Sequence, residues 1–392
     1  MKRWMICLLC AVMLCAACAW GEGEIVIPDV TVKQFDIPDN EAMAFLRSLG
    51  FGWNLGNTMD ATDDRFRGDD LDLEGYWCGV KTTKAVFEAL KEKGFSTVRI
   101  PVSWHNHVSG EDFRVNEAWM DRVQQLVDWA LACDLHVILN THHDNSPAFY
   151  YPDEAHFDSS LKYLTSVWGQ MAARFRDYDD RLILESMNEP RLVGTSHEWW
   201  FEQGNPECLE AAECINRLNQ AFVDTVRAAG GHNATRYLMV PGYDAAPANT
   251  DPAFFRLPED SADNRIIVSA HAYLPYSFAL DTKGVSSFDM KNLQQTGEIG
   301  AALNGLYERF ISRGIPVVMG EFGALNKDNL QDRVDLTAYY VAGASARGIP
   351  CVWWDNNAFR GSGENFGLLN RKTLAWPFPE IVEAAMKYAL HE

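Results

Sequence analysis

The sequence lacks several patterns that would place it in a common functional class. Beyond residue 19 it has no Cys-x-x-Cys pair, which argues against a zinc knuckle or a thioredoxin-like redox site. No Gly-x-Gly-x-x-Gly or phosphate-binding loop follows any predicted strand, which argues against nucleotide binding. No later stretch reaches the roughly 18 apolar residues of a membrane helix, so we expect no integral membrane segment in the mature protein.

Basic residues are scarce relative to acidic ones. The 392 residues include 34 Lys and Arg against 54 Asp and Glu, which gives a formal net charge of −20. A surplus of negative charge repels phosphate backbones and anionic lipids, so we expect no nucleic acid and no membrane surface as a partner. Hydrophobic residues at 47% and charged residues at 22% are typical of a globular chain and exclude wholesale disorder.

The N-terminus has the pattern of a processing signal. Lys2 and Arg3 precede an apolar stretch over residues 4–17 that is too short to span a bilayer. Small residues around position 18 predict a signal peptide over residues 1–19, cleaved after Ala19, and hence a secreted protein. A bacterial lipoprotein is the alternative, with Cys18 as the lipidated residue, although the position three before it is not Leu-like.

Removal of residues 1–19 changes both the charge and the cysteine content. It takes away two basic and no acidic residues, so the net charge becomes −22, and it leaves five of the nine cysteines. Cys208 and Cys214 lie six residues apart and could pair in an oxidising compartment, whereas Cys78, Cys133 and Cys351 lie in patterns that look structural. The sequence leaves open whether the first two pair.

Apolar runs rich in β-branched and aromatic residues alternate with helical patterns. The predicted strands are 51–55, 97–102, 136–141, 182–187, 237–241, 266–271, 316–321 and 350–354. The predicted helices are 82–93, 119–133, 161–176, 210–229, 293–313, 332–347 and 380–390, and 243–264 is expected to be loop with a short helix.

Eight apolar strands alternating with helices predict a closed parallel (β/α)8 TIM barrel of the α/β class. We expect one domain over residues 41–392, after an N-terminal tether over residues 20–40. A prior of roughly 150 residues per domain would instead suggest two or three domains, but a barrel with long loops uses more residues as one unit.

Polar residues stand at or near the C-terminal ends of these strands, where a barrel gathers its catalytic groups. One buried Glu could be a satisfied ion pair in the core. Two Glu, together with polar residues at most of the other strand ends, are harder to explain by packing. Burying so many polar groups costs free energy unless they face a cavity and one another. The candidates are Asn54, Arg99, His142, His143, Asn188, Glu189, His271, Tyr273, Glu321 and Trp354.

The chain resembles glycoside hydrolase family 5 over roughly residues 40 to 390. The motifs that carry the resemblance are Gly-Trp-Asn-Leu-Gly-Asn-Thr (52–58), Thr-Val-Arg-Ile-Pro-Val-Ser-Trp (97–104), Asn-Glu-Pro (188–190) and Gly-Glu-Phe-Gly (320–323). With His142-His143 and Trp-Trp-Asp-Asn (353–356), it is most similar to subfamily 4, whose members are endo-β-1,4-glucanases, xyloglucanases, lichenases and some xylanases. Asn-Glu-Pro alone is a weak motif, but the order of all these motifs on the predicted strands is specific.

The resemblance implies a retaining double displacement with a role for each carboxyl group. Glu189 would be the acid/base and Glu321 the nucleophile, about 5–5.5 Å apart, so that repulsion between them helps to hold one proton. Asn188 would bind the sugar 2-hydroxyl. Arg99 and Tyr273 would hold Glu321 ionised and aimed at the substrate.

The remaining candidates would contact the sugar at the cleavage site. His142 and His271 would touch that ring or tune the acid, and Trp354 would form an apolar platform beneath it. Asn54 and His143 are predicted to line the site, with a mainly structural role as the alternative. No cofactor and no metal is implied, and the partner would be a polysaccharide, β-glucan or xyloglucan, bound by a monomer.

Two other classes of protein compete with this interpretation. His142, His143 and Asp144 could form a metal site, but adjacent side chains on a strand point to opposite faces, so both histidines could bind one ion only at a bulge. A non-catalytic glycan-binding barrel is the second alternative, and the presence of both Glu189 and Glu321 favours the enzyme. Aromatic residues make up 12% of the chain, and some loop Trp could line a sugar cleft or merely pack. Nothing in them separates cellulose-type, mixed-linkage and xyloglucan chains.

Overall fold

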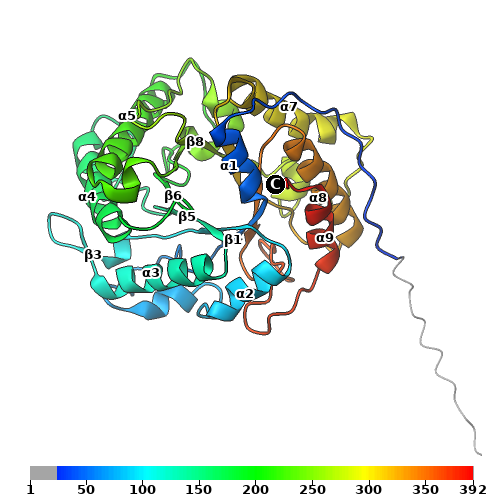
Figure 1. Ribbon diagram of the computed structural model, residues 1–392, viewed down its shortest axis with the longest axis horizontal. Helices are drawn as coiled ribbons and strands as arrows, with labels where there is room; N and C mark the ends of the chain where they lie inside the picture. The colour runs from blue at the N-terminus through cyan, green and yellow to red at the C-terminus, as the bar shows by residue number, and fades with distance from the viewer. Residues whose placement is uncertain (1–23, 392) are drawn as a thin grey trace, which may run out of the picture.

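Eight parallel strands form a closed barrel, as the sequence predicts (Figure 1). The computed structural model describes residues 24–391. Around the barrel the strand order is β1, β10, β9, β8, β7, β6, β5, β2, with β2 closing back on β1. The strands are β1 (Phe51–Leu55), β2 (Thr97–Ile100), β5 (His136–Asn140), β6 (Leu182–Glu185), β7 (Leu238–Pro241), β8 (Ile266–His271), β9 (Val317–Phe322) and β10 (Cys351–Asp355).

The strands are buried on both faces. Every strand residue of the barrel is buried except His136, which is half-buried at the start of β5. This matches the near-continuous apolar runs of the sequence, since helices cover the outer face of a parallel sheet. Strand β6 ends two residues and β5 one residue before the predicted end. Asn188 and Glu189 lie in the connection after β6, and His142 and His143 lie in the connection after β5.

The predicted helices are present and surround the barrel (Figure 1). They are α2 (Lys84–Glu92), α3 (Glu117–Ala132), α4 (Phe157–Arg174), α5 (Pro206–Ala228), α7 (Leu293–Arg309), α8 (Leu330–Ser345) and α9 (Pro379–Tyr388). The connection over 243–264 contains two short 3-10 helices, η4 (Tyr243–Ala245) and η5 (Pro247–Thr250). Further short elements are a hairpin of β3 (Val108–Ser109) and β4 (Arg114–Val115), and α6 (Tyr276–Ala279).

A helix that the sequence analysis did not predict closes the N-terminal end of the barrel. This helix, α1 (Glu41–Leu49), begins at Asn40, whose side chain accepts a hydrogen bond from the backbone N–H of Met43 at 2.8 Å. Its Phe45 stacks on Tyr237, just before β7, with ring centroids 3.9 Å apart. Because α1 fills this end, the open end is the C-terminal one.

The segment 24–39 lies extended along the outside of α8 and α9 (Figure 1). The backbone of Val26 exchanges two hydrogen bonds with the side chain of Gln331, at 2.9 and 2.8 Å, and the Val30 N–H donates to the Tyr388 hydroxyl at 2.8 Å. The predicted signal peptide and Cys18 lie outside the described residues. No described helix is long and apolar enough to cross a membrane.

Cys208 and Cys214 are both free and buried. They lie on the same helix, α5, and a separation of six residues places them on different sides of its axis. A disulfide between them would require that helix to unwind.

Candidate active site

Glu189 and Glu321 meet at the open end of the barrel. Glu321 is within β9, and Glu189 follows the end of β6, on the opposite side of the intervening β7 and β8. An oxygen of each carboxyl group and a ring nitrogen of His271 all lie within 4.8 Å of one another. A separation this short allows a carboxylate to attack an anomeric carbon directly, whereas an inverting pair needs about 6.5–9.5 Å to admit a water molecule.

Glu321 is held from both sides. Its Oε1 accepts a hydrogen bond from an Nη of Arg99 at 2.7 Å, and its Oε2 accepts one from the hydroxyl of Tyr273 at 2.8 Å. The Arg99 side chain has no exposed surface, and that of Glu321 is 6% exposed. A buried cation and a hydroxyl group thus each donate to one oxygen of Glu321 and fix the orientation of a group that can act as a nucleophile.

Asn188 and Asn54 both accept a hydrogen bond from Arg99, but only Asn188 has N–H groups left to bind a ligand. The Asn188 Oδ1 accepts at 2.7 Å, which fixes the carboxamide and leaves its N–H groups available to a ligand. The Asn54 Oδ1 accepts at 3.0 Å, and its amide nitrogen donates to main-chain carbonyls of β9 and β10 at 2.9 to 3.3 Å. Asn54 is fully buried, so it orients Arg99 from below and does not line the cleft.

Glu189 and His271 share a short hydrogen bond, with 2.8 Å between Oε1 and Nδ1. Burial raises the pKa of Glu189, but the hydrogen bond from His271 and its charge outweigh this and bring the pKa below its usual value. Burial lowers the pKa of His271, and the charge of Glu321 with the Glu189 hydrogen bond more than offsets it, so this pKa is raised. The free protein therefore keeps one proton in this pair, nearer to His271, and Glu189 can receive and pass it on.

The shared proton predicts that hydrolysis is lost at high pH. The rate should fall as the pH rises through the raised pKa of His271, because the pair then has no proton for the leaving group. That fall should lie above the ordinary histidine pKa of about 6.5. The measurement is kcat/KM against pH on a soluble β-glucan; a flat profile from about pH 4 to 9 would contradict the proposed pair.

His142 and Trp354 form the floor beside the carboxylates. Their rings are stacked, 5.8 Å apart with an interplanar angle of 5°. Burial, with the charges of His143 and Arg99, holds the pKa of His142 well below its usual value, so this ring is neutral. The amide group of Asn140 bonds to the His142 Nδ1 at 3.1 Å. Since the Asn140 Oδ1 already accepts from a backbone N–H at 3.1 Å, Nδ1 is the acceptor and Nε2 carries the proton.

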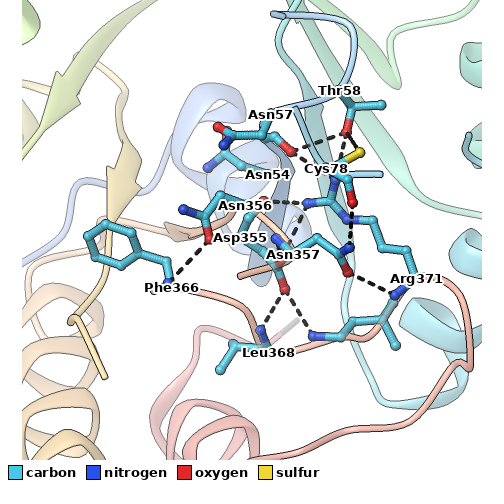
Figure 2. Close-up of polar contacts among 12 residues, drawn as sticks. Asn54, Asn57, Thr58, Cys78, Asp355, Asn356, Asn357, Phe366, Leu368 and Arg371 are labelled. Atoms are coloured by element: carbon cyan, nitrogen blue, oxygen red, sulfur yellow. Dashed lines mark hydrogen bonds and ion pairs between the residues drawn. The ribbon is translucent and has the colours of Figure 1, made fainter. Parts of the chain in front are cut away.

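Asp355 anchors the chain directly after Trp354. One of its oxygens accepts from the indole N–H of Trp53 at 2.9 Å and from the backbone N–H groups of Leu368 and Leu369 at 2.7 and 2.9 Å. The other accepts from the backbone N–H of Asn357 at 2.8 Å. Figure 2 shows that hydrogen bonds to this carboxylate hold the long connection between β10 and α9 against the end of the barrel.

Arg371 joins the same connection to the end of β1 (Figure 2). It donates to the carbonyl of Gly56 at 2.8 Å and to the hydroxyl of Thr58 at 2.6 Å, and it also contacts the main chain of Asp355. A Cβ at Gly56 would lie 2.7 Å from the indole of Trp354. The ring is therefore fixed by the loops that follow β1 and β10, and only glycine at position 56 leaves it enough room.

His143 lies at the mouth of the site, with Asp60 and Trp77 as neighbours. Its Nε2 is 4.0 Å from a carboxylate oxygen of Asp60, and its ring is 5.7 Å from that of Trp77. One nitrogen or oxygen each of Asp60, His142 and His143 lie within 4.8 Å of one another. The strand alternation expected to separate the two histidines does not apply, because β5 ends at Asn140.

The geometry nevertheless does not favour a metal ion bound by the three residues of the sequence hypothesis. The His142 Nε2 carries a proton and offers no lone pair. Asp144 is turned away from the two imidazoles: its Oδ1 accepts from the backbone N–H groups of Trp104 and His105, both at 2.9 Å, and lies 2.8 Å from the ring of His105.

Some residues that build the site were not among the sequence candidates. Glu185, Asn140 and Asp355 are fully buried polar residues at the ends of β6, β5 and β10, and each holds a predicted site residue or its neighbour in place. Their signal in the sequence is a single polar residue closing an apolar run, as in Leu-Ile-Leu-Glu over 182–185. That signal does not say which partner the side chain meets.

Comparisons with known proteins agree with this arrangement. The family description "Cellulase (glycosyl hydrolase family 5)" matches residues 59–360. Endoglucanase B of Ruminococcus albus is 46% identical over 371 residues, which cover 94% of this chain and 86% of that protein.

Two solved structures extend the likeness to three dimensions. A family 5 lichenase from Caldicellulosiruptor sp. F32 has a TM-score of 0.91 at 52% identity and covers 93% of this chain and 99% of its own. A "GH5-4 broad specificity endoglucanase" from Ruminococcus champanellensis, with bound cellotriose, has a TM-score of 0.83 at 45% identity and covers 90% and 100%.

Proposed function

Because the chain belongs to glycosyl hydrolase family 5 and is a glycoside hydrolase of the cellulase type, we propose that it cleaves internal β-1,4 bonds of β-glucans with retention of anomeric configuration. The observation that carries the proposal is the pair Glu189 and Glu321, within 4.8 Å at the open end of the barrel and with different partners. Glu321 accepts a hydrogen bond at each oxygen, from Arg99 and Tyr273, whereas Glu189 has a hydrogen-bonded proton source in His271.

The first step forms a covalent glycosyl-enzyme. A carboxylate oxygen of Glu321 attacks the anomeric carbon, the bond from that carbon to the glycosidic oxygen breaks, and the leaving oxygen takes the proton from Glu189, which the pair with His271 supplies. Asn188, fixed by Arg99, donates to the 2-hydroxyl of the sugar as positive charge develops on the ring. Trp354 offers its apolar face to the C–H groups of the same ring.

The second step releases the sugar. Glu189, now ionised, takes a proton from water, and the resulting hydroxide character attacks the anomeric carbon from the face that the leaving group vacated. Glu321 leaves as a carboxylate, and the two inversions together retain the configuration.

Exposed aromatic rings support action within a chain. Trp199, after β6, is 61% exposed and stacks against Arg191, whose guanidinium carbon is 3.8 Å from the ring centroid and whose Nη is 3.7 Å from Glu189. It thus adjoins the leaving-group side. Trp77, after β1, is 40% exposed and lies next to His143, beyond the stacked His142 and Trp354. Sugar rings on both sides of the cleaved bond would have a surface to stack on.

The proposed substrates are cellulose-type β-glucan, mixed-linkage glucan and xyloglucan, with xylan as the alternative on the same scaffold. The lichenase and broad-specificity endoglucanase activities of similar proteins support this range. The discriminating experiment is product analysis on soluble forms of these glycans and on mannan. We expect a rapid fall in viscosity and a mixture of oligosaccharides from the β-glucans, unchanged by a chelator.

The control is the Glu321→Gln protein on the same panel, which should release nothing. Products from mannan alone, or monosaccharide released only from chain ends, would contradict the proposal. Activity that a chelator abolishes would favour the metallohydrolase, and tight binding without products in the unmodified protein would favour the glycan-binding barrel.

We also propose that the protein is secreted. Lys2, Arg3 and the following apolar stretch support export, with Ala19 before the cleavage point and a lipoprotein anchored through Cys18 as the alternative. Expression of the full chain in a bacterial host should yield a soluble protein that starts at residue 20. Incorporation of labelled palmitate that is lost in Cys18→Ala would instead establish the lipoprotein.

A further inference from the structure

Glu185 is a third carboxylate of the barrel interior, one that the double displacement does not use. It ends β6, has no exposed surface, and lies below the catalytic pair. Its Oε2 accepts from the Nε of Arg99 at 2.7 Å, and its Oε1 accepts from the hydroxyl of Ser269, in β8, at 2.6 Å. Both its oxygens are therefore committed, and no ligand can reach it.

The consequence lies in how Arg99 distributes its N–H groups. A guanidinium commonly binds one carboxylate through two parallel N–H bonds. In Arg99, Nε donates a hydrogen bond to Glu185. One Nη donates to Glu321 and Asn54, and the other donates to Asn188. All four distances are 2.7 to 3.0 Å. Arg99 thus makes a single hydrogen bond to each of two carboxylates.

We propose that Glu185 is a positioning residue that binds the Nε of Arg99 and takes part of its positive charge, so that Arg99 is not the exclusive ion-pair partner of the nucleophile Glu321. Each oxygen of Glu321 then accepts one hydrogen bond, from Arg99 or Tyr273, and keeps a lone pair for the anomeric carbon. Without the charge of Glu185, the whole positive charge of Arg99 would act on Glu321 and lower its reactivity toward the anomeric carbon.

The charges of the site lead to the same conclusion. Arg99 is the buried cation between Glu185 and Glu321, at 2.7 Å from each. Other ionisable groups near the nucleophile are His271, Tyr273 and Glu364, with Glu189 next to His271. Because one positive charge is divided between two negative ones, Glu321 stays a better nucleophile than it would be in an exclusive ion pair.

The test is Glu185→Gln, assayed with an aryl β-cellobioside whose leaving group is good enough to need no protonation. It rests on the proposed function, because it presumes cleavage by Glu321. Gln has the same shape, and its amide can accept from the Arg99 Nε and still bond Ser269, so the fold should survive. For this substrate kcat/KM reports formation of the glycosyl-enzyme, and kcat reports its hydrolysis if that step is slower.

We expect Glu185→Gln to lower kcat/KM more than kcat. Formation should slow, with kcat/KM about 10- to 100-fold lower, because the nucleophile carries the whole charge of Arg99. Hydrolysis should slow less, because a carboxylate stabilised by Arg99 is a better leaving group. Loss of packing alone would lower both constants together. Glu185→Asp keeps the charge but cannot reach both partners, so its kcat/KM should fall by less than that of Glu185→Gln. This variant tests the role of Glu185 if the Gln variant does not fold.

The matched control is Asp260→Asn. Asp260 forms a two-contact ion pair with Arg227, at 2.7 and 2.6 Å, with both side chains nearly buried, and lies before β8 at the end of the barrel opposite the cleft. Its loss should lower the unfolding midpoint without changing kcat/KM. An unchanged kcat/KM in Glu185→Gln, or an equal fall in both constants, would overturn the positioning role. An unmodified protein that does not cleave the aryl cellobioside would overturn the proposed function instead.

Discussion

Glu321→Gln is expected to reduce hydrolysis of every β-glucan by roughly 10⁴-fold or more, with the fold intact. An amide has almost the shape of a carboxylate, so the hydrogen bond from Tyr273 can persist. What it lacks is the negative charge that attacks the anomeric carbon, and Arg99 is then left without one of its two anionic partners. The loss should be as severe for an aryl cellobioside with a good leaving group, because nucleophilic attack is needed whatever departs.

The measurement is the initial rate of reducing-sugar release, with thermal unfolding followed in parallel. Binding of cellotetraose should survive, since the aromatic rings and Asn188 are unchanged, and can be followed by calorimetry. Retention of more than a few per cent of the activity in a correctly folded variant would exclude Glu321 as the nucleophile. Loss of both binding and the unfolding transition would mean only that the variant had misfolded, and Glu321→Ala with added azide then decides the role, because a small anion can replace the missing carboxylate.

Glu189→Gln is expected to show the second-largest effect, and one that depends on the leaving group. On polysaccharide the rate should fall by about 10²- to 10⁴-fold, because the departing oxygen receives no proton. On an aryl cellobioside with a good leaving group the first step should stay fast, since no proton is needed. The glycosyl-enzyme should then accumulate, because the amide that replaces the carboxylate cannot take a proton from the attacking water.

Azide provides the diagnostic readout for this variant. As a nucleophile that needs no general base, it should attack the accumulated intermediate, raise kcat on the aryl substrate and give a glycosyl azide of β configuration. Glu185→Gln should show no such rescue, because its slow step comes earlier. If azide failed to raise the rate of Glu189→Gln, or if the loss were the same for good and poor leaving groups, Glu189 would not be the acid/base.

The barrel itself could be predicted from the sequence because its signal is local and repeated. Each strand of a parallel barrel is buried on both faces, so a short apolar run such as 97–100 or 136–140 marks it without knowledge of its partners. The N-terminal helix α1 was not predicted, because a nine-residue helix without a strand before it does not belong to the βα repeat. Its position is decided by what it covers, the starts of the strands, which only the closed barrel brings together.

The sequence alone determined which residues stand at the strand ends, including the two carboxylates and the polar residues near them. Only the tertiary structure decided which contacts each of these residues makes, and therefore its role. It showed that Asn54 faces inward to Arg99, that His271 is hydrogen-bonded to Glu189, and that Glu185, at the end of an apolar run, binds the same arginine as the nucleophile. The reason is physical: order along the chain fixes the identity of a side chain, but charge sharing and pKa shifts depend on distances of a few ångströms between strands that are far apart in sequence.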